Sequence, residues 1–275
     1  MTWERFYTYA KAEYEKNEGE RFFTFPLLWA CLTEKHRQGT GAMFSQEKAP
    51  QVLAEELARL LAGYPLQYYM GCWEFEGHDY LCRPPVLIPR EDTALLCQKA
   101  REALPQGGRL LDACCGSGIV AISVLLQRPD CTATSFDLSP EAVALTQENA
   151  RRLGVADRLT CRQMDLFDPQ LSCLLAQGNY QVLASNPPYI PSQTLDTLAE
   201  NLHHEPRLAL DGGPDGLRFY RRLWELYPLF PHLTQLWEIG YDQNQAIETL
   251  TQGLATVYED ESGNPRCAWL PPQNL

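Results

Sequence analysis

Apolar side chains recur at helical spacing at the start of the chain. Residues 3–14 follow the i, i+3, i+4 pattern of one helix face. Further apolar stretches cover residues 22–32 and 52–61, and the last is followed closely by Gly63, a residue type that commonly ends helices. We therefore predict a small helical domain over residues 1–63.

The pattern changes over residues 64–90. Glycines and prolines interrupt this segment, and residues 73–76 and 78–81 alternate between apolar and polar positions around Gly77. Alternation with a period of two is typical of strands, and two short strands around a glycine indicate a hairpin. We expect residues 64–90 to be a linker that contains a β-hairpin.

From residue 91 onward, short apolar segments alternate with longer amphipathic ones. The predicted strands are residues 109–112, 132–137, 158–164, 181–185, 233–239 and 256–259, and the predicted helices are residues 92–103, 119–126, 140–153 and 243–252. Such alternation is typical of a parallel sheet with helices on both faces. We expect residues 91–275 to form one α/β domain.

Composition narrows the possible partners. The 275-residue chain has a formal net charge of −12, whereas tight nucleic-acid binding usually needs a basic patch to neutralise phosphates. No apolar run approaches the roughly 20 residues that span a bilayer, and the N-terminus does not resemble a signal peptide. The ten cysteines include no Cys-x-x-Cys pair. We expect a cytoplasmic protein with no membrane span, no metal site and no direct nucleic-acid partner.

A glycine-containing turn joins a predicted strand to a predicted helix at residues 111–119. Gly116 and Gly118 let the backbone approach a ligand closely, but proteins that bind NAD, FAD or S-adenosylmethionine share such turns. The three-glycine pattern that cradles a pyrophosphate is incomplete, since Cys114 occupies the first glycine position. S-adenosylmethionine has no phosphate, so the turn favours it over a dinucleotide.

Two acidic residues follow the next strands. Asp137 ends one strand, 19 residues after Gly118, where a carboxylate can accept both ribose hydroxyls of an adenosine. Asp165 follows the third strand and is placed to receive the adenine amino group, with Leu166 against the ring. A capping role in a loop is the alternative for Asp165.

The segment Asn186-Pro187-Pro188-Tyr189 follows the fourth strand, at the edge where open α/β sheets bind ligands. The Asn186 side-chain oxygen and the Pro187 carbonyl are two acceptors that can hold both N–H groups of a planar amide or amine. Such positioning aligns the nitrogen with a methyl donor, while Tyr189 offers a flat face for stacking. The prolines stiffen the backbone and add no competing N–H. The segment predicts methyl transfer to a planar nitrogen, of either an amide or a base.

Further segments resemble the HemK/PrmC family, the protein-(glutamine-N5) methyltransferases of peptide chain release factors. They are residues 63–71, 86–93, 205–220, 238–240 and 260–266. DNA amino-methyltransferases share the tetrapeptide but not these flanks. The resemblance implies a Rossmann-like class I methyltransferase with a mostly parallel seven-stranded sheet, preceded by a helical domain that binds the protein partner.

The resemblance also implies S-adenosyl-L-methionine as cofactor and, as acceptor, the glutamine of the Gly-Gly-Gln loop of bacterial release factors. The implied cofactor-binding residues are Asp112, Cys114, Cys115, Gly116, Ser117, Gly118, Asp137, Asp165, Leu166 and Asn186. The implied substrate-binding residues are Asn186, Pro187, Pro188 and Tyr189, with Asn186, Pro187 and Tyr189 in catalytic roles. Cys114 and Cys115 stand where the family usually has Gly-Thr.

Other functions remain open from the sequence. One is a nucleic-acid amino-methyltransferase of the adenine-N6 type, which the negative charge disfavours. Another is a non-catalytic S-adenosylmethionine-binding interaction protein, which would not need an intact Asn-Pro-Pro-Tyr segment. A dehydrogenase is disfavoured by the incomplete glycine pattern.

Overall fold

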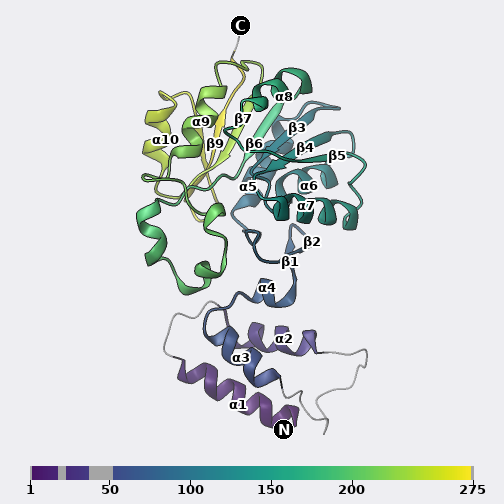
Figure 1. Cartoon of the computed structure of the whole chain (residues 1–275), viewed down its shortest axis with the longest axis vertical. Coiled ribbons are helices and arrows are strands. Elements are labelled where there is room, and N and C mark those ends of the chain that lie inside the picture. The colour runs from purple at the N-terminus through teal and green to yellow at the C-terminus, as the bar shows by residue number, and fades with distance from the viewer. Residues whose placement is uncertain (1, 18–22, 37–51, 274–275) are drawn as a thin grey trace. The chain divides into compact units, whose positions relative to one another are not determined.

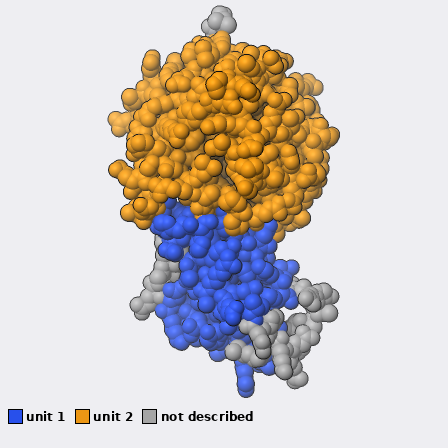
Figure 2. Space-filling view, viewed as in Figure 1, with its two compact units in different colours: residues 1–71, 198–204 blue, residues 72–197, 205–275 orange. Residues whose placement is uncertain are grey.

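The computed structural model describes residues 2–17, 23–36 and 52–273. The chain divides into two compact units, which Figure 2 shows in different colours. One comprises residues 1–71 and 198–204, and the other comprises residues 72–197 and 205–275. The boundaries expected at residues 63 and 90 remain predictions.

The first unit is helical. Its helices are α1 (Trp3–Lys16), α2 (Phe25–Lys35), α3 (Leu53–Leu61) and α4 (Leu66–Met70), followed in sequence much later by the 3₁₀ helix η2 (Glu200–His204). Thr2 and Thr24 cap the first two helices through their side chains. Leu28, Leu32 and Leu57 lie in the core of this unit. The helices expected at residues 3–14 and 52–61 are confirmed, and part of the stretch that begins at residue 22 lies outside the described residues.

The second unit contains the predicted α/β sheet (Figure 1). Its seven strands are β3 (Arg109–Ala113), β4 (Thr132–Asp137), β5 (Leu159–Gln163), β6 (Val182–Ser185), β7 (Thr234–Glu238), β8 (Thr256–Glu259) and β9 (Pro265–Leu270). Their order is β5-β4-β3-β6-β7-β9-β8, and among these seven strands β9 alone runs in the opposite direction. A separate antiparallel hairpin pairs β1 (Cys72–Phe75) with β2 (His78–Leu81). The predicted hairpin and the mostly parallel seven-stranded sheet are confirmed.

Alternate residues of the strands pack on opposite faces of the sheet. Leu110 and Leu236 belong to a core formed with α5 (Thr93–Ala103), α6 (Ile119–Gln127) and α7 (Pro140–Arg152). Leu111 and Trp237, one position further along, belong to a core formed with α8 (Gln170–Gly178), α9 (Arg218–Leu226) and α10 (Asn244–Leu250). The near-continuous apolar strands are therefore buried on both sides.

The chain reverses its direction of travel through the sheet between β3 and β6. From β3 it continues to β4 and β5 on one side, and it then crosses to β6 on the other side of β3. The carboxyl ends of neighbouring strands diverge at such a switch point and leave a crevice for ligands. The turn at residues 114–118 and the Asn186 segment follow these two strands, so the topology brings them together.

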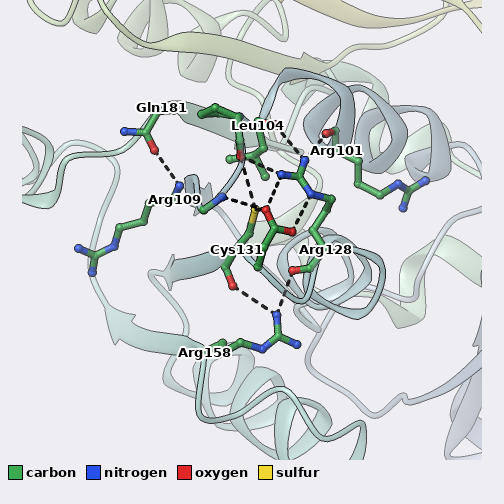
Figure 3. Close-up of polar contacts among 10 residues, drawn as sticks. Arg101, Leu104, Arg109, Arg128, Cys131, Arg158 and Gln181 are labelled. Atoms are coloured by element: carbon green, nitrogen blue, oxygen red, sulfur yellow. Dashed lines mark hydrogen bonds and ion pairs between the residues drawn. The ribbon is translucent and has the colours of Figure 1, made fainter.

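Two arginines tie the loops at the opposite, amino edge of the sheet (Figure 3). Arg128 donates to the carbonyls of Arg101 and Leu104, both at 2.9 Å. Arg158 donates to the carbonyls of Arg128, at 3.1 Å, and Cys131, at 3.3 Å. These bonds satisfy helix-end and loop carbonyls that have no helical partner, so this edge is closed by structural contacts.

No helix within the described residues has the length and apolar character needed to cross a membrane.

Candidate active site

The turn after β3 has a backbone that ordinary side chains tolerate poorly. Gly118 has φ +85°, and a Cβ there would lie 2.7 Å from Thr146 Cγ2, so only glycine fits. Cys114 adopts φ +59° without being glycine. The Gly118 N–H donates to the Cys115 carbonyl at 2.7 Å, and the Cys115 N–H donates to the Phe136 carbonyl at 3.1 Å. The turn is thus tight and is attached to β4.

Asp137 binds the turn directly. Its Oδ2 accepts the Gly116 N–H at 2.9 Å, and its Oδ1 accepts the Ser139 N–H at 2.9 Å. Burial raises the pKa of Asp137, and the backbone N–H donors of Gly116, Ser139 and Leu138 oppose that rise. Each carboxylate oxygen can accept more than one hydrogen bond, so both can also receive ligand hydroxyls.

Helix α7 holds the turn from the other side. Thr146 Oγ1 donates to the Gly116 carbonyl at 3.0 Å, and Asn149 Nδ2 donates to the Ser117 carbonyl at 2.9 Å. Asn149 is fully buried, and its Oδ1 accepts the Leu81 N–H of β2 at 2.8 Å. These two positioning residues could not be predicted from the sequence, because nothing in a helical pattern marks a buried threonine or asparagine for this role.

A large cavity of about 700 Å³, counted to its open mouth, lies at the carboxyl edge of β3, β4 and β6. The predicted residues that line it are Cys114, Gly116, Asp137, Asp165, Leu166, Asn186 and Pro188. Its remaining wall is mostly apolar and includes Leu138 and Phe219.

An adjoining pocket continues from this cavity. Leu87, Cys114, Gly116 and Asn186 line both spaces. The predicted residues Cys115 and Ser117 line only the adjoining pocket, together with Arg90 and Thr93. Asn186 therefore lies where the two spaces meet.

Glu205 fixes one wall of the adjoining pocket. The residue is 6% exposed, its Oε2 accepts the Ile88 N–H at 2.9 Å, and its Oε1 pairs with Arg90. A carboxylate buried in this way is stabilised by its paired donors. Glu205 lies in one of the segments that carried the family resemblance, but its partner could not be read from the sequence.

Asp112 does not line either space. The residue is fully buried, and its Oδ2 accepts from Ser135 Oγ at 3.1 Å and from the Ala121 N–H at 3.3 Å. The pKa of Asp112 is raised to about 7, because burial outweighs the opposing effect of these two donors. Its carboxylate thus links β3 to β4 and to the first turn of α6, and its predicted contact with the cofactor remains a prediction.

The segment after β5 gives Asp165 the capping role, and its predicted contact with the adenine amino group remains a prediction. Asp165 Oδ1 accepts the Phe167 N–H at 2.9 Å, as a loop cap does, and Asp165 also lines the cavity. Leu166 is 2% exposed, and its carbonyl accepts from Arg222 Nε at 3.1 Å. Phe219 of α9 adds an aromatic ring to the cavity wall, which the sequence analysis missed because α9 is distant in sequence.

The Asn186-Pro187-Pro188-Tyr189 segment is held rigidly. Asn186 Nδ2 donates to Thr93 Oγ1 at 3.2 Å, and Gln243 Nε2 donates to the Tyr189 carbonyl at 3.0 Å. At Gly216 a Cβ would come within 2.4 Å of the Tyr189 carbonyl oxygen, so a glycine permits this close approach.

The members of this segment differ in position. Asn186 and Pro188 reach the cavity, whereas Pro187 and Tyr189 line neither space. Burial raises the pKa of the Tyr189 phenol, so the ring stays neutral. The substrate-binding roles of Pro187 and Tyr189 therefore remain predictions.

Residues 91–214 match the family described as "Methyltransferase small domain". The chain is 38% identical to the release factor glutamine methyltransferase of Moorella thermoacetica over 253 residues, which cover 88% of this chain and 87% of the relative. The chain belongs to the release factor glutamine methyltransferase family. A human member, "MTRF1L release factor glutamine methyltransferase", is 32% identical over 277 residues, covering 92% of this chain and 80% of the relative.

Solved structures agree on the fold. The catalytic domain of hMettl16, in a complex with MAT2A 3′UTR hairpin 1, superposes with a TM-score of 0.58 at 10% identity and covers 98% of this chain and 91% of that one. "Human methyltransferase 10 domain containing protein" gives a TM-score of 0.51 at 14% identity, over 69% of this chain and 86% of that one. At these identities the likeness shows a class I methyltransferase fold and nothing about substrate.

The walls of the cavity fit S-adenosylmethionine, the cofactor of this methyltransferase family. Asp137 offers a carboxylate for ribose hydroxyls, and Leu138, Leu166 and Phe219 offer apolar surface for a purine. A Cβ on Gly116 would meet nothing within 4 Å, so the turn is open on that side. An apolar wall with few well-placed polar groups is the usual composition of such a site.

Proposed function

We propose that this enzyme methylates the side-chain amide nitrogen of the glutamine in the Gly-Gly-Gln motif of peptide chain release factors, with S-adenosyl-L-methionine as methyl donor. The observation that carries the proposal is the position of Asn186, which lines both the large cavity and the adjoining pocket. A side chain at that junction can touch the cofactor and the acceptor together.

The acceptor nitrogen of an amide is a poor nucleophile because its lone pair is delocalised. Asn186 gives its Nδ2 donor to Thr93, so the other branch of its planar amide, Oδ1, is available as an acceptor for a substrate N–H. The Pro187 carbonyl is the second proposed acceptor. Two acceptors hold the nitrogen in one orientation, and such positioning is worth at most roughly 7–11 kcal/mol of the barrier.

S-adenosylmethionine, when bound, supplies a methyl group activated by attachment to a positively charged sulfur. Asp137 would hold the ribose, Asp165 the adenine amino group, and Leu166 and Phe219 the faces of the ring. Cys114, Cys115 and Ser117 would border the amino-acid end of the cofactor in the adjoining pocket. The apolar wall excludes water from the reacting groups.

Tyr189 is proposed to stack on the planar amide rather than to act as a base. Its raised phenol pKa keeps the ring neutral at ordinary pH, so it has no phenolate to accept a proton.

A protein acceptor agrees with the net charge of −12. A nucleic-acid amino-methyltransferase would need to attract a polyanion to an acidic protein. We propose bacterial release factors as the partners, with no direct nucleic-acid substrate.

The proposal is tested by incubating the enzyme with methyl-labelled S-adenosylmethionine and, in parallel, release factor, release factor with its Gly-Gly-Gln glutamine replaced by asparagine, duplex DNA and RNA. Label on the unaltered release factor alone is the expected result. Label on DNA or RNA and none on release factor would overturn the proposal. The Asn186→Ala enzyme serves as the inactive control.

A further inference from the structure

Glu238 is a buried carboxylate beside the proposed acceptor residue. It is the last residue of β7 and is 1% exposed. Strands β6 and β7 are parallel, and Ser185 pairs in register with Trp237. The next residue on each strand is Asn186 and Glu238, so the two lie side by side at the carboxyl edge of the sheet.

Both side chains belong to the face of the sheet that α5 covers. Leu236, two residues before Glu238, and Ala184, two residues before Asn186, lie in the core formed with α5. Residues two apart on a strand share a face. Thr93, the first residue of α5, is fully buried and accepts from Asn186 Nδ2 at 3.2 Å.

The polar contacts of the Glu238 carboxylate are with this same pair. Hydrogen bonding with the Thr93 hydroxyl and with the Asn186 side chain stabilises its ionised form. Within the described residues, Glu238 Oε2 has no hydrogen-bond partner. An acceptor-rich carboxylate therefore faces the donor side of Asn186. Leaving a buried acceptor without a partner costs free energy, and such a group calls for an explanation such as a functional role.

We propose that Glu238 is a positioning residue for Asn186: together with Thr93 it selects the amide orientation in which Nδ2 faces the carboxylate and Oδ1 faces the acceptor nitrogen. The inference rests on the proposed function, since it gives Asn186 Oδ1 the task of holding the substrate amide. An ionised carboxylate only accepts hydrogen bonds, whereas the Thr93 hydroxyl alone can donate or accept and so accommodates either amide orientation.

The charges around Glu238 make this selection sensitive to pH. The pKa of Glu238 is raised to about 7: burial is the largest cause and the Asp92 carboxylate adds to the rise, whereas the Thr93 hydroxyl, the Arg266 guanidinium and the Asn186 side chain oppose it. Four other titratable groups face it, namely Cys97 of α5, Cys267 of β9, Tyr189 and Tyr220 of α9. Burial raises the pKa of each of these four, so they stay neutral while Glu238 titrates.

Protonation reverses the role of the carboxyl group. A protonated Glu238 carries an O–H that can donate to Asn186 Oδ1 and so favour the opposite amide orientation. The orientation that serves the substrate is then lost as pH falls through about 7. The rate of methyl transfer should consequently fall on the acidic side of about pH 7, which gives the pH–rate profile an acidic limb.

The first test compares the wild type with Glu238→Gln and Asp92→Asn. We measure kcat and KM for the release factor from pH 6 to pH 9, after thermal unfolding has shown which variants fold. In E238Q we expect kcat to fall roughly tenfold, the acidic limb to disappear, and the dissociation constant of the cofactor to stay within about twofold. In D92N we expect the limb to remain and to move to lower pH, because a negative charge that raises the Glu238 pKa is gone.

A wild-type profile without an acidic limb would overturn the inference. An E238Q enzyme with the wild-type kcat and pH profile would do the same, and so would a D92N limb that moves to higher pH. If E238Q fails to fold, the direction in which the acidic limb moves in D92N tests the inference alone. The Asp92 side chain is 46% exposed, so its replacement is tolerated more readily.

A second measurement needs neither cofactor nor acceptor. The side-chain amide signal of Asn186, assigned by its absence in Asn186→Ala, is followed by ¹⁵N NMR while the pH is varied. We expect it to shift with a midpoint near 7 in the wild type and to stay constant in E238Q. A wild-type amide signal that does not change with pH would contradict the inference. If the NMR transition is present but the release factor is not methylated, only the proposed function is contradicted.

Discussion

Asp137 Oδ2 accepts the Gly116 N–H at 2.9 Å, so the carboxylate that ends β4 and the turn that follows β3 form one rigid unit. Helix α7 adds bonds from Thr146 and Asn149 to the same turn. These bonds within the protein hold the proposed cofactor-binding edge in place, which reduces the ordering cost of binding.

The Asp137→Asn substitution should weaken cofactor binding roughly ten- to hundredfold. An amide has one acceptor oxygen, so it cannot hold the Gly116 N–H and the Ser139 N–H and still accept two ribose hydroxyls. Calorimetric titration with S-adenosylmethionine measures the loss. Asp130→Asn, at the amino edge of the sheet, is the matched control and should leave the affinity unchanged; equal affinities for both variants would contradict the assignment.

The Asn186→Ala substitution should separate chemistry from cofactor binding. It removes the proposed acceptor for the substrate N–H and keeps Asp137 and the apolar wall, so kcat should fall roughly a hundredfold or more while the cofactor still binds measurably. Single-turnover methyl transfer and a parallel titration give the two quantities. Wild-type turnover in this variant would show that Asn186 holds no reacting group.

The sequence predicted the elements of the site better than its internal bonds. The strand ends and the turn followed from apolar periodicity and glycines, and Asp137 and Asn186 followed from their places after strands. The family resemblance also implied Asp112 as a cofactor residue; its side chain is fully buried and lines neither space, so that role remains a prediction. Side-chain direction at a strand end depends on twist and register, which local patterns do not encode.

The residues that the sequence analysis missed act across long sequence separations. Asn149 bonds Ser117 from 32 residues away, and Thr93 bonds Asn186 from 93 residues away. Phe219 lines the cavity from α9, which packs on the opposite face of the sheet from α5, α6 and α7. Such pairs depend on the order of strands in the sheet, so only the assembled fold reveals them.

The backbone at Cys114 should reject β-branched side chains. Its φ of +59° lies in the left-handed region, which is strained for Val and free of strain for Gly. Cys114→Val should lower the free energy of unfolding by about 1–2 kcal/mol more than Cys114→Gly. Denaturant unfolding of the two variants measures the difference, and equal stabilities would mean that the turn relaxes.

Asp112 should make the stability of the fold depend on pH. Its pKa is raised from 3.8 to about 7 in the folded chain, so the folded state binds the proton more tightly than the unfolded chain does. The stability from this proton is fully present below the unfolded pKa and is lost as the pH rises through about 7. Asp112→Asn imitates the protonated form, so it should be more stable than the wild type at pH 8, by on the order of 2–4 kcal/mol, and equal to it near pH 4.

Asp130 should affect the pH dependence of stability in the opposite direction to Asp112. Its pKa is lowered by hydrogen bonds from Arg128 and from the Gly107 N–H, so Asp130→Asn should lose stability at pH 8 and lose less as the pH falls. Urea unfolding at a series of pH values tests both variants. The same pH dependence in Asp112→Asn as in the wild type would contradict the assignment of the titration to Asp112.

The central claim is that the acceptor nitrogen is a glutamine side chain of a release factor. Its most direct test is peptide mapping by mass spectrometry of release factor incubated with S-adenosylmethionine and either the wild-type enzyme or Asn186→Ala. The account predicts one added methyl group on the glutamine of the Gly-Gly-Gln peptide with the wild type and none with the variant. A methyl group on any other residue, or an unmodified release factor beside a cofactor-loaded and folded wild-type enzyme, would contradict it.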